Sequence, residues 1–121
     1  MSAPSGGPLV QHALLAMLEK VKEGKISLEK VVEKMAHAPT VLFRIENRGF
    51  IREGYAADLV IVDPSSKTSV TKDNLLYQCG WSPFEGHTFS HKIKTTLVNG
   101  RIVWDNNRIF EHSAGQRLTF S

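Results

Sequence analysis

The side chains best suited to catalysis or metal binding in this sequence are its five histidines and its one cysteine. His87 and His91 have a spacing that would bring two imidazoles together on a helix, but the glycine before them and the residues between them give little helical signal. In an extended chain, side chains four residues apart are separated by about 13 Å, which is too far for one metal ion. The pattern therefore favours loop histidines over a metal site.

The remaining histidines and the cysteine have ordinary structural explanations. We expect His12 to lie off the apolar face of a helix, His37 to lie at the end of another helix, and His112 to lie in the C-terminal tail. Cys79 has no adjacent histidine to lower its pKa, so we expect a buried or inert thiol. None of the common local signatures of metalloproteases, serine hydrolases or phosphate-binding loops occurs. The residues alone therefore indicate none of the usual catalytic constellations.

A glycine-rich entry into the first helix is a weak candidate for ligand binding. Ser5, Gly6 and Gly7 precede Pro8, where apolar helical periodicity begins. Free N–H groups at a helix N-terminus attract anions, and glycine lets a ligand approach the backbone closely. Many helix entries have this composition without binding anything, so the pattern alone assigns no function.

Several other polar residues are better explained by structure than by chemistry. Glu85 lies in a turn-rich loop, which we expect Trp81 and Phe84 to anchor by packing. Asp58 and Asp63 flank a short apolar stretch, where carboxylates typically cap turns. These acids are therefore not expected to form an acid–base pair.

Two helices are predicted near the N-terminus. The first covers residues 8–23, with Pro8 at its first position and Gly24 as its left-handed C-terminal cap. Ser27 is a good N-cap for the second helix, whose apolar stripe consists of Leu28, Val31, Val32, Met35 and Ala36. We expect this helix to end at residues 37–39, because the residue before a proline avoids the helical region. A separate short helical turn then starts at Pro39.

After Asn47 the pattern becomes typical of strands. Residues 58–63 predict a buried strand stopped by Pro64, and residues 94–98 and 101–104 predict a hairpin around Asn99 and Gly100. A second turn at residues 105–107 precedes a short β segment at residues 108–110, whereas residues 73–91 are expected to be irregular. The predicted fold class is α+β, with an N-terminal helical hairpin followed by a small antiparallel β unit.

Length and composition exclude several classes of protein. The chain of 121 residues is long enough for one compact unit, and 41% apolar residues can supply a core. A single cysteine excludes an internal disulfide framework, and the net charge of +3 comes from dispersed residues, which does not indicate a nucleic-acid partner. The longest apolar run, residues 13–18, is much shorter than the ~20 residues that cross a bilayer. We expect a cytoplasmic chain without nucleic-acid or membrane partners.

Taken together, four motifs resemble the C-terminal part of a dihydroorotase, a metal-dependent amidohydrolase of pyrimidine biosynthesis. In order, they are Ala3-Pro4-Ser5-Gly6-Gly7-Pro8, NRGFIREGYAADLVIVD at residues 47–63, Ser82-Pro83-Phe84-Glu85-Gly86 and Thr96-Leu97-Val98-Asn99-Gly100-Arg101-Ile102-Val103. Residues 54–63 resemble many amidohydrolases, whereas residues 82–86 together with the entry loop resemble dihydroorotases more narrowly. The resemblance covers nearly the whole chain.

The resemblance implies that this chain is a fragment. Such enzymes combine a TIM barrel of roughly 250 residues with a β-sandwich made from both chain ends. Residues 1–46 would supply the final loop and helices of the barrel, and residues 47–121 part of the sandwich. The zinc ligands and the catalytic base of the family would lie upstream of Met1, so the fragment should hold no zinc and be inactive alone.

By the same resemblance, Ser5 and Gly6 match the backbone positions that contact the substrate dihydroorotate, and Ala3 and Pro4 shape that loop. Without the barrel, the apolar face of the helices would lose its partner, so we expect the chain either to self-associate through that face or to fold around its own β unit, with more exposed apolar area than a monomer normally shows. Three alternatives remain open: another cyclic amidohydrolase such as an allantoinase or dihydropyrimidinase, a non-catalytic dihydroorotase-like partner of aspartate transcarbamoylase, and a free-standing α+β binding module.

Overall fold

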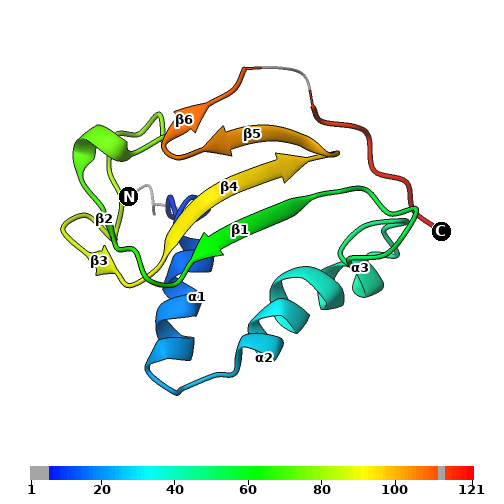
Figure 1. Ribbon diagram of the computed structural model, residues 1–121, viewed down its shortest axis with the longest axis horizontal. Coiled ribbons are helices and arrows are strands. Elements are labelled where there is room, and N and C mark those ends of the chain that lie inside the picture. The colour runs from blue at the N-terminus through cyan, green and yellow to red at the C-terminus, as the bar shows by residue number, and fades with distance from the viewer. Residues whose placement is uncertain (1–5, 112–113) are drawn as a thin grey trace, which may run out of the picture.

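Helices come first in the chain and an antiparallel sheet follows, as the α+β prediction requires. The computed structural model describes residues 6–111 and 114–121. In Figure 1, two helical segments form a V whose point is the turn at Gly24, and the sheet lies across its open end. The elements are α1 (Ala13–Lys22), α2 (Leu28–Val32), η1 (Glu33–His37), α3 (Ala38–Leu42), β1 (Leu59–Asp63), β2 (Thr68–Ser69), η2 (Lys72–Asn74), β3 (Thr88–Phe89), β4 (Lys92–Val98), β5 (Arg101–Asp105) and β6 (Arg108–Ile109).

Helix α1 begins at Ala13, so the prediction that it begins at Pro8 is wrong. The reason is a set of long-range hydrogen bonds at Gln11. Its backbone N–H donates to the hydroxyl of Tyr77 at 2.7 Å, and its side-chain oxygen accepts from the N–H of Leu76 at 2.8 Å. These bonds hold the segment before α1 against a distant loop as a turn, which helical periodicity does not report.

The junction between α1 and α2 agrees with the predicted caps. Gly24 has a φ of +71°, and the N–H of Lys25 donates to the carbonyl of Lys20 at 3.0 Å, as in a Schellman motif. The hydroxyl of Ser27 accepts from the N–H of Lys30 at 3.2 Å, which caps α2. Both predicted helix boundaries at this turn are confirmed.

The second helical segment does not end before Pro39, so that prediction is wrong. It continues from α2 through η1, a π-helical turn in which the N–H of Ala38 donates to the carbonyl of Glu33, and into α3. A proline inside an α-helix lacks an N–H and pushes against the carbonyl four residues earlier. The wider π turn relieves that conflict, which lets the helix pass through Pro39 and end at Leu42.

The main sheet has the strand order β1-β4-β5-β6, and all its pairs are antiparallel. The β4–β5 turn has positive φ at Asn99 (+49°) and Gly100 (+78°), and the β5–β6 turn has positive φ at Asn106 (+44°) and Asn107 (+69°). Two positive φ values are the signature of the type I′ turns that suit twisted hairpins. Both predicted turns are confirmed. Strand β1 lies at one end of the sheet, and within the described part of the chain only β4 pairs with it.

A second, two-stranded sheet of β2 and β3 lies beside α1. Strand β3 lies within residues 73–91, and the 3-10 helix η2 overlaps the start of this range. The prediction that the range is irregular is therefore partly wrong. Strands of two residues are too short to show alternation. The small core joins this sheet to α1: its buried members are Leu15, Val70 and Phe89, packed against Ala16, Leu75, Phe84 and Ile93.

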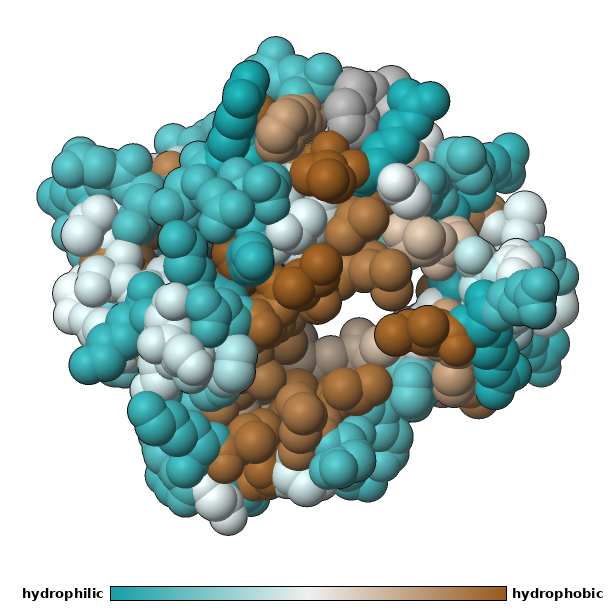
Figure 2. Space-filling model, viewed as in Figure 1, coloured by the Kyte–Doolittle hydropathy of each residue, from teal (hydrophilic) through white to brown (hydrophobic). Residues whose placement is uncertain are grey.

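Much apolar surface remains exposed outside this core. Figure 2 shows hydrophobic side chains around an opening between the sheet and the second helical segment. On that segment Leu28, Val32 and Met35 are exposed, whereas Val31 is buried. The predicted exposure of the helical face is confirmed for these three residues, and self-association through it stays a prediction.

Candidate functional site

The predicted substrate loop is only partly within the described residues. Ala3, Pro4 and Ser5 lie outside them, and Gly6 is exposed with a φ of +72° and no atom within 4 Å of the place a Cβ would occupy. Because α1 begins at Ala13, the loop is not at a helix N-terminus, and the helix-dipole argument for anion binding there is wrong. The backbone contact of Ser5 and Gly6 with a substrate stays a prediction.

His12 is buried, so the prediction that it lies off the apolar face is wrong. Its side chain is 2% exposed and its ring lies 6.1 Å from that of Phe84 and 6.2 Å from that of Phe89, centroid to centroid. Burial lowers the pKa of His12, which favours the neutral imidazole. His12 belongs to the turn before α1, so helical spacing could not predict its direction.

Of the other described histidines, His87 contacts the same two phenylalanine rings as His12, and His37 lies against a different ring. His87 is exposed beside Phe89, at 5.5 Å between ring centroids, and His37 stacks on Phe50 at 4.3 Å. His112 lies outside the described residues. Within residues 6–111 and 114–121, no three His, Cys, Asp or Glu side chains are grouped to hold a metal ion, and the donors described do not fit the zinc site that the resemblance implies.

Nor is any described helix both long and apolar enough to pass through a bilayer.

The loop that carries Ser82-Pro83-Phe84-Glu85-Gly86 is anchored by one aromatic residue. Phe84 packs against the core, whereas Trp81 is half-exposed, so the prediction that both aromatics anchor the loop is wrong for Trp81. Ser82 is buried and its hydroxyl accepts from the N–H of Phe84 at 3.2 Å. Cys79 and Glu85 are exposed, so the thiol is not buried, and the expectation that it is inert stays a prediction.

Asp58, just before β1, and Asp63, the last residue of β1, act as turn caps, as predicted. Asp58 accepts from the backbone N–H of Asn99 at 2.9 Å and forms an ion pair with Arg48, which ties the start of β1 to the β4–β5 turn. Asp63 accepts from the hydroxyl of Ser66 at 2.7 Å, and this bond, together with a backbone bond, lowers the pKa of its carboxyl. Both carboxylates are engaged in structure, which leaves neither free for acid–base chemistry.

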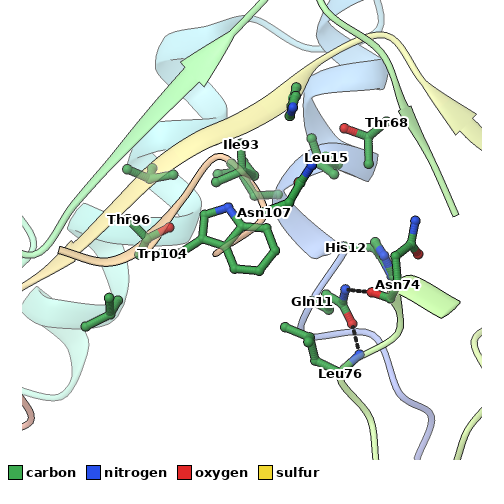
Figure 3. Close-up of a pocket in the computed structure, with 14 residues that line it drawn as sticks. Gln11, His12, Leu15, Thr68, Asn74, Leu76, Ile93, Thr96, Trp104 and Asn107 are labelled. Carbon is green, nitrogen blue, oxygen red and sulfur yellow. Dashed lines mark hydrogen bonds between the residues drawn. The ribbon is translucent and has the colours of Figure 1, made fainter. Parts of the chain in front are cut away.

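A mainly apolar pocket of about 350 Å³ lies between α1 and one face of the sheet, as Figure 3 shows. Its lining residues are Gln11, His12, Leu14, Leu15, Val60, Thr68, Asn74, Leu76, Lys92, Ile93, Thr96, Val103, Trp104 and Asn107. Two lining atoms, Nδ1 of His12 and Nε1 of Trp104, are buried without a hydrogen-bond partner among the described residues. From the sequence, Trp104 is predicted only to lie in a strand, and no local pattern predicts this cavity.

A carboxylate on α1 fixes the loop before β4. Glu19 accepts from the N–H of Ser90 at 2.7 Å through one oxygen and from its hydroxyl at 2.8 Å through the other. These two bonds to Ser90 lower the pKa of Glu19, the backbone bond most. They join α1 to the residue that follows β3.

This lowered pKa predicts acid sensitivity. A carboxyl whose pKa is lower in the folded state contributes stability above its unfolded pKa, about 4.3, and loses that contribution as the pH falls through the folded pKa. We expect the urea midpoint to fall between about pH 5 and pH 3, and to fall less in Glu19→Gln. Glu53→Gln, at an exposed loop position, is the matched control and should follow the unmodified chain. Identical pH profiles for all three chains would contradict the assigned role of Glu19.

Sequence comparison places this chain among known proteins. The profile of the amidohydrolase family matches residues 5–103. A dihydroorotase of Halobacterium salinarum is 40% identical over 107 residues, which cover 88% of this chain and 25% of that protein. A dihydroorotase of Pyrococcus furiosus is 34% identical over 114 residues, covering 94% of this chain and 27% of that protein. The resemblance to dihydroorotases is confirmed, and the chain spans about a quarter of the length of these relatives.

Solved structures agree with the sequence relatives. The L-hydantoinase (dihydropyrimidinase) of Arthrobacter aurescens superimposes with a TM-score of 0.86 at 30% identity, covering 97% of this chain and 27% of that one. A D-hydantoinase superimposes with a TM-score of 0.80 at 30% identity, covering 88% of this chain and 23% of that one. On the strength of the family profile and these relatives, the chain belongs to the amidohydrolase family.

Proposed function

We propose that this chain is the C-terminal portion of a dihydroorotase, a zinc-dependent hydrolase of cyclic amides that interconverts dihydroorotate and N-carbamoyl-aspartate in the cytoplasm. The observation that supports it most is 40% identity to a dihydroorotase over 88% of this chain but only 25% of that relative. In this proposal residues 1–46 supply the last loop and helices of the barrel, and residues 47–121 supply part of the β-sandwich.

Such a portion contributes shape and substrate contacts to the enzyme, without chemistry of its own. The described residues do not fit a zinc site, so no step of the hydrolysis is assigned to them. The proposed contacts are backbone groups of Ser5 and Gly6, and the exposed backbone at Gly6 is compatible with a ligand close to it. The metal and the catalytic base would come from the rest of the enzyme.

A second candidate function is that of a dihydropyrimidinase or hydantoinase. The solved structures with TM-scores of 0.86 and 0.80 carry those names. Dihydroorotase is favoured because relatives of that name reach 40% identity, whereas these structures are 30% identical. Both candidates belong to the amidohydrolase family, and they differ in their substrates.

The test compares two proteins, the purified 121-residue chain and a chimera. In the chimera this chain replaces the matching region of the Pyrococcus furiosus dihydroorotase, and the alignment of the two covers 94% of this chain. We expect ring opening of dihydroorotate by the chimera and none by the chain alone with added zinc, measured by the loss of ultraviolet absorbance. Turnover by the chain alone would refute the fragment proposal, and a chimera that prefers dihydrouracil or hydantoin would favour the second candidate.

A further inference from the structure

The segment that carries Gly6 is attached to a distant part of the chain through Gln11. The backbone N–H of Gln11 donates to the hydroxyl of Tyr77 at 2.7 Å. Its side-chain amide donates to the carbonyl of Asn74 at 2.8 Å, and its side-chain oxygen accepts from the N–H of Leu76 at 2.8 Å; Figure 3 draws these two bonds. All three partners belong to one short loop, and we call this set of three bonds the Gln11 clamp.

The loop on the other side of the clamp is itself fixed. Asn74 is the last residue of η2, where its side-chain oxygen accepts from the N–H of Thr71 at 3.1 Å. Its side-chain amide donates to the carbonyl of Ser69, in β2, at 2.7 Å. The next residue, Leu75, packs against the buried core. A residue bonded to this loop is therefore connected to the core through only a few contacts.

His12 reinforces the clamp from the neighbouring position. Its side chain is buried, and its ring meets that of Tyr77 edge-on, at 6.2 Å between centroids. Tyr77 therefore contacts two consecutive residues, Gln11 through its hydroxyl and His12 through its ring. Because two consecutive residues are anchored, the direction of the chain before α1 is fixed as well as its position.

Gly6 requires such an anchor because its immediate surroundings do not hold it. Gly6 is exposed, and no atom lies within 4 Å of the position that a Cβ would take. Glycine loses more conformational freedom on ordering than any other residue, and Gly7 follows directly. The five residues from Gly6 to Gln11 span at most about 17 Å, and Pro8 between them has a restricted φ. The Gln11 clamp therefore limits where the backbone of Gly6 can lie.

We propose that Gln11 is a positioning residue for substrate binding, whose clamp holds the backbone of Gly6 where that backbone can contact the ring of a cyclic amide. The inference rests on the proposed function, in which Gly6 belongs to the substrate loop. Gln11 does not touch the substrate and takes no part in the bond-breaking step. Loss of the clamp should weaken binding of the substrate and of the transition state alike, which raises KM and leaves kcat unchanged.

The test uses the chimera with the Pyrococcus furiosus dihydroorotase. Gln11→Met keeps the length of the side chain but removes both of its bonds, and Tyr77→Phe keeps the ring but removes the acceptor of the backbone bond. We expect each variant to raise KM for dihydroorotate about 5- to 10-fold, the effect of losing about one hydrogen bond to the substrate. Gln116→Met and Tyr55→Phe, at positions outside the clamp, are the matched controls and should leave KM unchanged.

Two readouts separate positioning from a merely structural role. A structural defect would reduce the amount of folded enzyme, which lowers the apparent kcat without changing KM. Amide hydrogen exchange of residues 6–12 of the chimera, measured by mass spectrometry, should be faster in Gln11→Met than in Gln116→Met, because the clamp is open more often.

The outcomes distinguish this inference from the proposed function. An unchanged KM for dihydroorotate in Gln11→Met, or a raised KM without faster exchange, would overturn the positioning role and leave the proposed function intact. Turnover of hydantoin in place of dihydroorotate, with a KM that rises in Gln11→Met, would support the positioning role and refute the proposed substrate.

Discussion

Replacing Phe89 by alanine is expected to lower the free energy of unfolding by about 3–5 kcal/mol, the usual cost of removing a buried phenylalanine. Phe89 is 1% exposed and packs with Leu15 and Val70, the other buried members of the core. Its ring also meets that of Phe84 edge-on, at 5.3 Å between centroids. Because this core is small, few other contacts can compensate for the cavity that the alanine leaves.

The measurement is urea unfolding followed by circular dichroism at constant pH. Phe43→Ala is the matched control, since Phe43 is 62% exposed and its replacement should change the unfolding free energy by no more than about 0.5 kcal/mol. Equal losses for Phe89→Ala and Phe43→Ala would mean that the second sheet is not packed on α1 as described.

Gly49→Ala is expected to cost about 3 kcal/mol, because it adds strain in the backbone to a steric conflict. Gly49 has a φ of +78°, where side chains are unfavourable. A Cβ there would overlap Cγ2 of Thr40 and lie 2.9 Å from the carbonyl oxygen of Ala36. The loop that contains Gly49 would have to move away from the helical segment that carries Ala36 and Thr40.

Two comparisons separate the backbone effect from the clash. Gly54 has a φ of +81° but no atom within 4 Å of the position that an added methyl group would take, so Gly54→Ala should cost only about 1 kcal/mol. Adding Thr40→Ala to Gly49→Ala should recover part of the lost stability, because it removes the nearest atoms. Equal urea midpoints for Gly49→Ala and Gly54→Ala would show that close packing at Thr40 is not limiting.

The elements that could be predicted are those with local causes. The Asn99-Gly100 turn, the cap at Ser27 and the glycine after α1 each depend on the conformational preference of one or two residues. The cap at Asp63 follows from short-range chemistry of the same kind, whereas Asp58 binds the distant turn at Asn99. For residues of this type, the amino acid itself predicts the local structure, so a single sequence is sufficient.

The features that could not be predicted depend on distant partners. The start of α1 is set by bonds from Gln11 to a loop more than sixty residues away, and the burial of His12 follows from that same turn. The passage of the helix through Pro39 depends on a π turn, for which the apolar spacing gives no sign. The orphaned Nε1 of Trp104 becomes visible only when α1 and the sheet are brought together.

The candidate substrate loop illustrates a different limit. Ser5 and Gly6 are identified by resemblance alone, because their types and spacing are common at helix entries. A backbone contact with substrate leaves no signature in side-chain chemistry, and the residues that would complete such a site are not in this chain according to the proposed function. The family can therefore be identified from these 121 residues, whereas the residues that carry out the reaction cannot.

Strand β1 has a further consequence for the handling of the chain in solution. Its outer edge has no strand beside it in the described part of the molecule, it carries no lysine, and its Val60 and Ile61 are half-exposed. Apolar edges of this kind recruit strands from other molecules and begin aggregation, which charges or prolines along an edge normally prevent. The solubility of the chain after synthesis should therefore depend on how soon that edge is covered.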